Sequence, residues 1–235
     1  MALFVIGDPH LSFSVDKPMD IFRGWTDYID RLEKNWNSVV GENDSVVVAG
    51  DISWAMNFEE AKKDFHFLHS LNGTKYIIKG NHDYWWGTMS KMNKFLADNG
   101  FDSIKIIHNN AYKVEGFALA GTRGWFYDDS EGDINKVILR EAGRLRASLA
   151  EAHKLGGEII AFLHYPPLNE IQRCDELLSV LHEFPVKRCF FGHLHGYVAP
   201  GCAKISDGDI DFRLISADFL QFVPKLIPVE IEENI

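Results

Sequence analysis

The amino-acid sequence predicts an α/β fold built on parallel strands. In its first hundred residues, short apolar runs alternate three times with segments of helical periodicity. This is the pattern of strands joined by crossover helices, and it returns after residue 158. With 235 residues, 46% of them hydrophobic, and no linker or low-complexity segment, we expect one domain over residues 1–235.

Three strand–helix units make up the first part of the chain. Apolar runs predict strands over residues 3–6, 45–49 and 75–79. Apolar residues at helical spacing predict helices over residues 22–40, 58–72 and 88–98. Asn57, followed by Glu60 three residues later, is typical of a capping box at the start of the second helix.

The second part of the chain departs from this rhythm and then resumes it. Three short strands joined by turn-forming residues indicate a meander, at residues 103–107, 112–114 and 117–120. A long helix is expected over residues 133–154, with Asp133 as its N-cap. The last expected elements are strands over 159–163, 189–191, 210–215 and 222–226 and a helix over 174–183.

Composition excludes several classes of protein. The formal net charge of −10 argues against duplex nucleic acid as a substrate, since such binding relies on clustered Lys and Arg. Two bound divalent ions would reduce that charge, so a small phosphorylated substrate is compatible with it. We expect no membrane span and no signal peptide. Three cysteines without a Cys-x-x-Cys pair favour a reducing, cytoplasmic location.

Polar side chains follow five of the expected strands. The carboxyl ends of strands in an open α/β sheet share one edge, where ligands bind, so these residues are expected to converge. Residues i and i+2 of an extended segment point the same way and can grip one ion together. The polar groups are Asp8 with His10, Asp51, Asn81 with His82 and Asp83, His164, and His193 with His195.

The chemistry of these side chains predicts a metal centre. Two carboxylates, one amide oxygen and four imidazoles form a mixed nitrogen and oxygen set, which suits Mn, Fe or Zn better than Ca or Mg. Seven ligands exceed the needs of one tetrahedral ion and predict two divalent ions, with Mn favoured and one carboxylate shared. Within the stretch after the third strand, we interpret Asn81 as a ligand, His82 as a general acid and Asp83 as the group that orients it.

These motifs together resemble the calcineurin-like metallophosphoesterases. The resemblance covers positions 8 to 195 and includes the whole motif set in order. The motifs are Asp8-x-His10, Gly50-Asp51, Gly80-Asn81-His82-Asp83, His164 and Gly192-His193-x-His195. It implies a four-layer αββα sandwich of two mixed sheets flanked by helices, and a metallophosphoesterase domain over residues 1–235.

The resemblance also implies roles for the site residues. One ion would be held by Asp8, His10, Asp51 and His195, and the other by Asp51, Asn81, His164 and His193. Asp51 would then bridge the two ions. A metal-bridging hydroxide would attack the phosphorus in line, and His82 would protonate the leaving oxygen as general acid. Arg123 follows another strand-like run and is a candidate for substrate binding, although a structural ion pair explains it equally well.

Departures from the family pattern indicate which branch of the superfamily the chain resembles. Protein Ser/Thr phosphatases of this superfamily carry Gly-Asp-x-His-Gly, Asp-Arg-Gly and Gly-Asn-His-Glu. Here Leu11 follows His10, Ser53-Trp54-Ala55 occupies the second region, and Asp83 replaces Glu. The chain is more similar to the bacterial phosphohydrolase and phosphodiesterase branches, and monoester or diester specificity is left open. The alternative is a non-catalytic scaffold for protein partners with the same fold.

Overall fold

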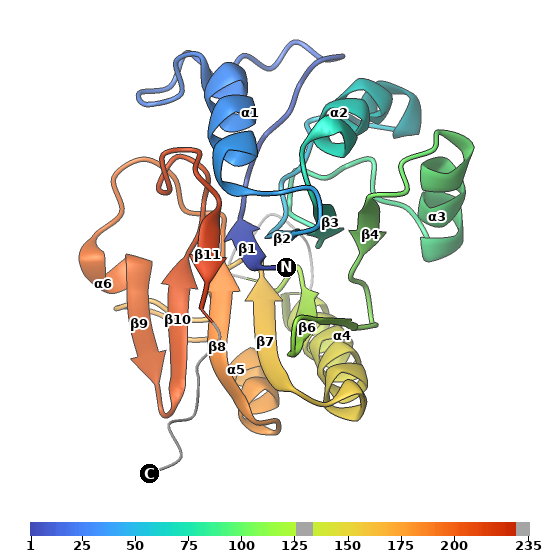
Figure 1. Cartoon of the computed structure of the whole chain (residues 1–235). Helices are drawn as coiled ribbons and strands as arrows, with labels where there is room; N and C mark the ends of the chain where they lie inside the picture. The colour runs from blue at the N-terminus through green and yellow to red at the C-terminus, as the bar shows by residue number, and fades with distance from the viewer. Residues whose placement is uncertain (126–133, 229–235) are drawn as a thin grey trace.

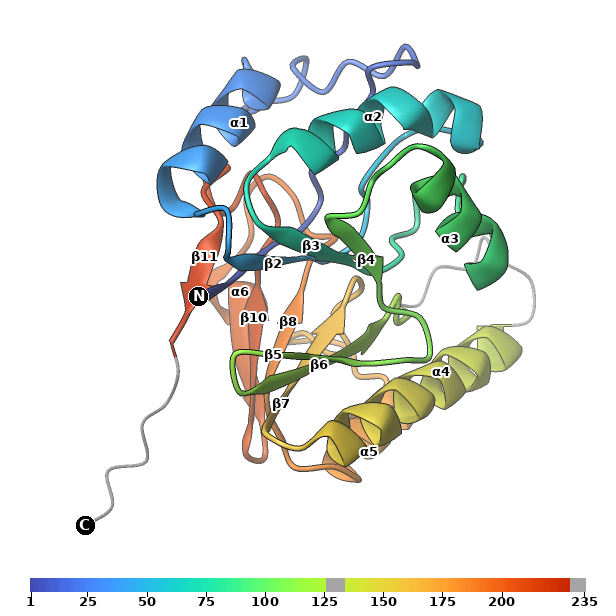
Figure 2. The same ribbon diagram turned by 45° about the vertical axis from the view of Figure 1, so that its right-hand side comes forward.

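Two mixed β-sheets lie face to face, and helices cover the outer side of each (Figures 1 and 2). The computed structural model describes residues 1–125 and 134–228. Figure 2 shows the four layers in one view, with α1, α2 and α3 on one outer face and α4 and α5 on the other. This arrangement confirms the predicted αββα sandwich.

The first sheet is formed by the N-terminal strand–helix units. Its strand order is β11-β1-β2-β3-β4, and β1 to β4 run parallel while β11 is antiparallel to β1. The strands are β1 (Leu3–Ile6), β2 (Ser45–Val48), β3 (Thr74–Ile77), β4 (Ile104–Ile106) and β11 (Lys225–Ile227). The helices that cover it are α1 (Tyr28–Val39), α2 (Phe58–Ser70) and α3 (Met89–Asp98).

The second sheet has the order β5-β6-β7-β8-β10-β9, in which the four central strands are parallel and the two edge strands antiparallel. Its strands are β5 (Tyr112–Val114), β6 (Phe117–Thr122), β7 (Glu158–Leu163), β8 (Val186–Phe191), β9 (Lys204–Asp207) and β10 (Ile210–Leu214). Its helices are α4 (Ile134–Leu155) and α5 (Asp175–His182), and the short α6 (Pro200–Ala203) precedes β9.

The hydrophobic core consists of three apolar layers. Strand β1 shows how they arise, because successive side chains of a strand point to opposite faces. Phe4 and Ile6 pack under the helices of the first sheet, whereas Leu3 and Val5 pack between the two sheets. All four are buried, which explains why this strand reads as a continuous apolar run.

The structure moves two expected boundaries for a clear reason in the backbone, and a third cannot be compared. Helix α1 begins at Tyr28 rather than at residue 22, because Gly24 and Asp27 adopt left-handed backbone with φ of 92° and 51°. The last strand spans Lys225–Ile227 rather than 222–226, since Gln221 and Phe222 are also left-handed. Asp133, the expected N-cap of α4, lies outside the described residues.

The expected meander is wrong in its first half. Strand β4 pairs with β3 in the first sheet, whereas β5 pairs with β6 in the second. The chain crosses between the sheets at Asn109, whose φ is 61°, and the Asn110 side chain accepts from His108 N and donates to Ile106 O. Only β5 and β6 form the expected hairpin. The sequence interpretation also missed β9 and α6.

Candidate metal centre

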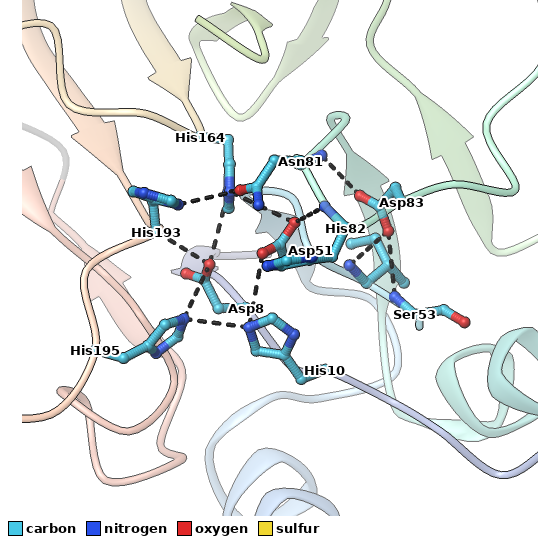
Figure 3. A network of polar contacts seen from close by, with 12 residues as sticks. Asp8, His10, Asp51, Ser53, Asn81, His82, Asp83, His164, His193 and His195 are labelled. Atoms are coloured by element: carbon cyan, nitrogen blue, oxygen red, sulfur yellow. Dashed lines mark hydrogen bonds and ion pairs between the residues drawn. The ribbon is translucent and has the colours of Figure 1, made fainter. Parts of the chain in front are cut away.

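The predicted ligands meet at one end of the sandwich, where both sheets present the carboxyl ends of their parallel strands (Figure 3). Asp8, Asp51 and Asn81 follow β1, β2 and β3 of the first sheet. His164 and His193 follow β7 and β8 of the second. The two sheets are joined at this end by a bridge between Gly7 and Ser216. The site is therefore built across the sheet–sheet interface.

Left-handed backbone places four of these side chains. The φ angles are 57° at Asp8, 47° at His10, 49° at Asp51 and 70° at His193. Residues other than glycine rarely adopt this conformation, which costs of order 1 kcal/mol or more at each position. This conformation turns the backbone sharply where each of these strands ends. The clustering of such residues is typical of functional sites.

Two motif glycines allow the backbone to lie against the carboxylates. A Cβ on Gly80 would collide with the backbone nitrogen and Oδ1 of Asp51. A Cβ on Gly192 would collide with Oδ2 of Asp8. The atoms that a Cβ would meet belong to Asp51 and Asp8, which the site itself holds in place. These two positions of the motifs therefore require glycine.

One group of candidate ligands consists of Asp8, His10 and His195, each of which offers one atom within 4.8 Å of the others. His195 Nε2 lies 3.5 Å from Asp8 Oδ1 and 3.2 Å from His10 Nε2. Two imidazole nitrogens so close together, beside a buried carboxylate, suit a shared cation.

A second group consists of Asp8, Asp51 and His164. His164 Nε2 lies 3.4 Å from Asp51 Oδ1 and 2.6 Å from Asn81 Oδ1. Asn81 Oδ1 in turn lies 3.1 Å from His193 Nδ1. Asp51 is also 3.6 Å from His10 Nε2 and thus lies between the two groups, although the residue common to both is Asp8.

The electrostatics of the cluster fit divalent cations. Burial and the nearby charge of Asp8 raise the pKa of Asp51 to about 8, since two buried carboxylates oppose each other's ionisation. Burial, with the charge of His164, lowers the pKa of His193 to about 3, which keeps that ring in its neutral, metal-binding form. Oδ2 of Asp8 is buried and has no hydrogen-bond partner within the described ranges. Cations would satisfy this oxygen and relieve the carboxylate repulsion.

The Asp83 carboxylate binds backbone groups of two loops, and its expected role in orienting His82 remains a prediction. Its carboxylate accepts hydrogen bonds from the backbone of Ile52, Ser53 and Gly80 at 2.8, 3.2 and 2.7 Å and from Trp85 Nε1 at 3.1 Å. It thus ties the loop after β3 to the loop after β2. His82 Nδ1 instead lies 3.2 Å from the Tyr84 hydroxyl. Burial and the charge of His164 lower the pKa of His82 to about 4.

Asp218 belongs to the site and was missed from the sequence. Its Oδ1 lies 3.0 Å from His195 Nδ1, and its Oδ2 accepts from Gly196 N at 2.8 Å. Burial works to lower the pKa of His195, but hydrogen bonds to Asp218 and Asp8 outweigh it and raise the pKa to about 10. Asp218 follows β10, so the strand-end rule that found the other ligands would have found it.

Arg123, the candidate substrate contact, and the aromatic residues around His82 lie close to the site. Arg123 is buried, and its guanidinium packs 4.7 Å from the Trp125 ring centre. Its carbonyl accepts from His164 N at 3.0 Å, so its backbone supports a candidate ligand, and its role in substrate binding remains a prediction. Trp85, beside the motif, is buried against Phe65. Within residues 1–125 and 134–228, the aromatic ring nearest that of His82 belongs to Trp54, at 4.1 Å between ring centres.

Known proteins are similar to this chain in sequence and in fold. Residues 1–197 match the sequence profile of the calcineurin-like phosphoesterases. An uncharacterized protein, MJ1445 of Methanocaldococcus jannaschii, is 37% identical over 78 residues, which span 33% of this chain and 40% of that relative.

Two solved structures are similar in fold. TT1561 of Thermus thermophilus superimposes with a TM-score of 0.59 at 12% identity, over 90% of this chain and 87% of that one. GAP50, described as the anchor in the inner membrane complex of Plasmodium, gives 0.53 at 15% identity, over 93% and 72%. At these identities the two structures bear on the fold alone.

Proposed function

Because the chain belongs to the calcineurin-like phosphoesterase family, we propose that it is a metal-dependent phosphoesterase that hydrolyses a phosphomonoester or phosphodiester. One observation carries the proposal. Seven candidate ligands from five strand ends, in two different sheets, converge at one buried edge. Backbone strain, close-packed glycines and an unsatisfied buried carboxylate oxygen all accompany them.

The proposal assigns each candidate ligand to an ion. Asp8, His10, Asp51 and His195 would hold one divalent ion, and Asp51, Asn81, His164 and His193 the other, with Mn favoured over Fe or Zn. When bound, such ions would polarise the phosphate and lower the pKa of water. The ligands themselves would be held in register by the strained loops and by Asp218.

His82 is proposed to deliver a proton to the leaving oxygen. It is not part of either ligand group, and its Nδ1 is paired with the Tyr84 hydroxyl. In the protonated ring both nitrogens carry hydrogen, so Nδ1–H can donate to the Tyr84 hydroxyl while Nε2–H gives its proton to the leaving oxygen, which leaves His82 neutral. Tyr84 would then be a positioning residue that holds the ring of the proton donor in place.

Chromogenic substrates test the proposal directly. Protein reloaded with Mn should cleave p-nitrophenyl phosphate or bis-p-nitrophenyl phosphate, and the ratio of the two rates separates monoesterase from diesterase activity. His82→Ala should leave metal content intact and lower turnover by about 100-fold or more for the corresponding phenyl esters, whose leaving oxygen is more basic, and by less for the p-nitrophenyl esters. His66→Ala, on the exposed face of α2, is the matched control and should leave turnover unchanged. If the protein takes up metal but hydrolyses neither compound, the proposed phosphoesterase activity is wrong.

A non-catalytic scaffold is the second candidate, suggested by the description of GAP50 as an anchor. It predicts that the chain binds no metal, or binds it without turnover, whereas the convergence of every candidate ligand favours the enzyme. We further propose a small phosphorylated substrate rather than duplex nucleic acid, which the net charge of −10 disfavours, and a cytoplasmic location, in keeping with the free cysteines Cys174, Cys189 and Cys202. Among the described residues, no helix is long and apolar enough to cross a bilayer.

A further inference from the structure

A cavity of about 420 Å³ opens directly beside the candidate metal centre. Three site residues form its floor, namely His10, His82 and His195. The volume falls in the range of pockets that enclose a ligand of more than a few atoms. Neither the metal ligands nor the proposed acid accounts for a space of this size, because a phosphate group alone would not fill it.

The walls of the cavity are apolar and mainly aromatic. Met19, Phe22 and Trp25 come from the segment between β1 and α1, and Trp54 comes from the loop after β2. Such flat rings favour stacking against a planar, apolar group. Arg23 is the one Arg or Lys among the residues that line the cavity.

Two of these rings are fixed against the site. Trp54 stacks on His10 at 5.1 Å between ring centres, with the planes 21° apart, and lies 4.1 Å from the His82 ring. Trp25 is 2% exposed and makes edge contacts with His10, His195 and Phe222 at 5.8, 5.6 and 5.1 Å. The aromatic surface is therefore preformed and does not have to be assembled by the ligand.

The position of His82 indicates which part of a substrate meets this surface. On the proposed function, His82 protonates the leaving oxygen, so the group attached to that oxygen lies on the His82 side of the phosphate. That side is the Trp54 wall of the cavity.

We propose that this cavity binds the leaving group of the substrate and selects a bulky, planar aromatic group over a small aliphatic alcohol. The inference rests on the proposed phosphoesterase function and adds the class of substrate. A nucleoside is one source of such a group, and a simple aryl ester is another. The two share the planar apolar ring that the cavity would recognise.

Matched pairs of esters test the proposal with the Mn-loaded protein. Phenyl and 2-naphthyl phosphate have leaving groups of similar acidity but different size, and we expect kcat/KM to favour the naphthyl ester by about tenfold or more. Adenosine 5′-monophosphate and ribose 5-phosphate share one kind of leaving oxygen but differ by a base. A preference within this second pair would identify a nucleoside, and a preference within the first pair alone would identify an aryl ester. Equal rates within both pairs would overturn the proposal.

Phe22→Ala is the informative variant, because Phe22 lines the cavity and has no ring contact with the site histidines among the described residues. It should reduce kcat/KM for the naphthyl ester more than for the phenyl ester, chiefly through KM. Phe13→Ala is the matched control, since Phe13 lies in the same segment with similar exposure (43% against 53%) and lines a different cavity. It should leave the naphthyl-to-phenyl ratio unchanged, and an equal effect of both variants would count against the cavity.

Calorimetric titration separates failure of this inference from failure of the proposed function. The probes are 2-naphthylphosphonic and phenylphosphonic acid, which carry no ester bond to cleave. We expect tighter binding of the naphthyl compound and loss of this difference in Phe22→Ala, whether or not any ester is turned over. If esters are hydrolysed but the two phosphonates bind equally, the cavity assignment is wrong and the enzyme stands. If the phosphonates are distinguished but no ester is hydrolysed, the pocket stands and the phosphoesterase does not.

Discussion

His82 and Asp83 are neighbours in the sequence but act in different parts of the structure. The carboxylate of Asp83 receives four hydrogen bonds that hold two loops together, whereas the ring of His82 pairs with Tyr84. The sequence indicated correctly that Asn81, His82 and Asp83 lie beside the end of β3. It did not reveal the pairing, because the direction of a side chain in an irregular loop depends on contacts with the loop after β2, about thirty residues earlier.

This difference predicts opposite effects for two substitutions. Tyr84→Phe should lower kcat by about tenfold through loss of the hydrogen bond to His82, with little change in the thermal midpoint because Tyr84 is half exposed. Asp83→Asn should lower the free energy of unfolding by about 2–4 kcal/mol, since an amide cannot accept all four hydrogen bonds. Urea denaturation and steady-state kinetics of both variants provide the check. A stable Asp83→Asn protein with low turnover would restore Asp83 as the group that orients His82.

Asp218 gives a second prediction at the scale of single residues. A carboxylate behind a metal-binding imidazole fixes the ring and raises its basicity, and loss of such a partner costs about 10–100-fold in metal affinity. Asp218→Asn should therefore weaken Mn binding by that amount, measured by competition with a chelating dye. The control is Asp209→Asn, in the exposed turn between β9 and β10, which should bind Mn like the wild type. Unchanged affinity in Asp218→Asn would remove Asp218 from the site.

At the scale of elements, the end of α2 depends on an unusual buried lysine. Lys75 in β3 is fully buried, and its Nζ donates to the carbonyls of His69, Leu71 and Gly73 at 3.1, 2.6 and 2.8 Å. These carbonyls lie in the last turn of α2 and the loop after it, where helices leave acceptors unsatisfied. The start of the same helix is capped as the sequence predicted, with Asn57 Oδ1 accepting from Glu60 N at 3.0 Å.

Lys75→Met should destabilise the fold by about 2–4 kcal/mol because three carbonyls lose their donor. Burial lowers the pKa of Lys75 from 10.5 to about 8. Between these values the unfolded chain binds a proton that the folded chain does not, so the contribution of Lys75 to stability rises with pH. The difference in free energy of unfolding between wild type and Lys75→Met should widen by up to about 3 kcal/mol from about pH 8 to about pH 10.5. Denaturation at both pH values, with Lys105→Met on the exposed side of β4 as control, tests this. A constant gap would show that the three carbonyls keep the ammonium charged.

Elements whose apolar pattern is regular were predictable, and those set by backbone conformation were not. The buried parallel strands and the long helices repeat with clear periods, and the structure confirms them. The start of α1 and the crossing after β4 depend on left-handed residues such as Asp27 and Asn109. Asp and Asn adopt that conformation more often than most residues, but the majority of them do not, so sequence alone does not mark where it occurs.

At the scale of the whole molecule, the candidate centre draws ligands from both sheets and lies on their interface. The sequence predicted which residues converge, because the strand-end rule applies within each sheet. That the chain forms two sheets followed from the family resemblance and not from periodicity, since β4 and β5 read alike but belong to different sheets. Bound ions would therefore link the two halves of the sandwich.

Metal removal should accordingly lower the stability of the entire fold. A ligand at a concentration about 100 times its dissociation constant stabilises the native state by about 2.7 kcal/mol, which for a chain of this size raises the thermal midpoint by about 5–10 °C. Calorimetric scans with Mn and with a chelator should differ by this amount. His164→Ala should reduce the difference, because it removes the ligand that β7 contributes to one of the two ions. Identical scans for the wild type would show that no ion links the sheets.

The left-handed backbone at Asp8, His10, Asp51 and His193 also bears on how such a chain would evolve. Glycine adopts this conformation without strain. A change to glycine at any of these positions would relax the backbone but would remove the side chain that the proposed reaction needs. A lineage released from selection for the reaction would be expected to drift toward glycine there, and to do so without altering the sandwich. Glycines at these four positions in a descendant would then be a heritable record that the chemistry had been lost while the architecture survived.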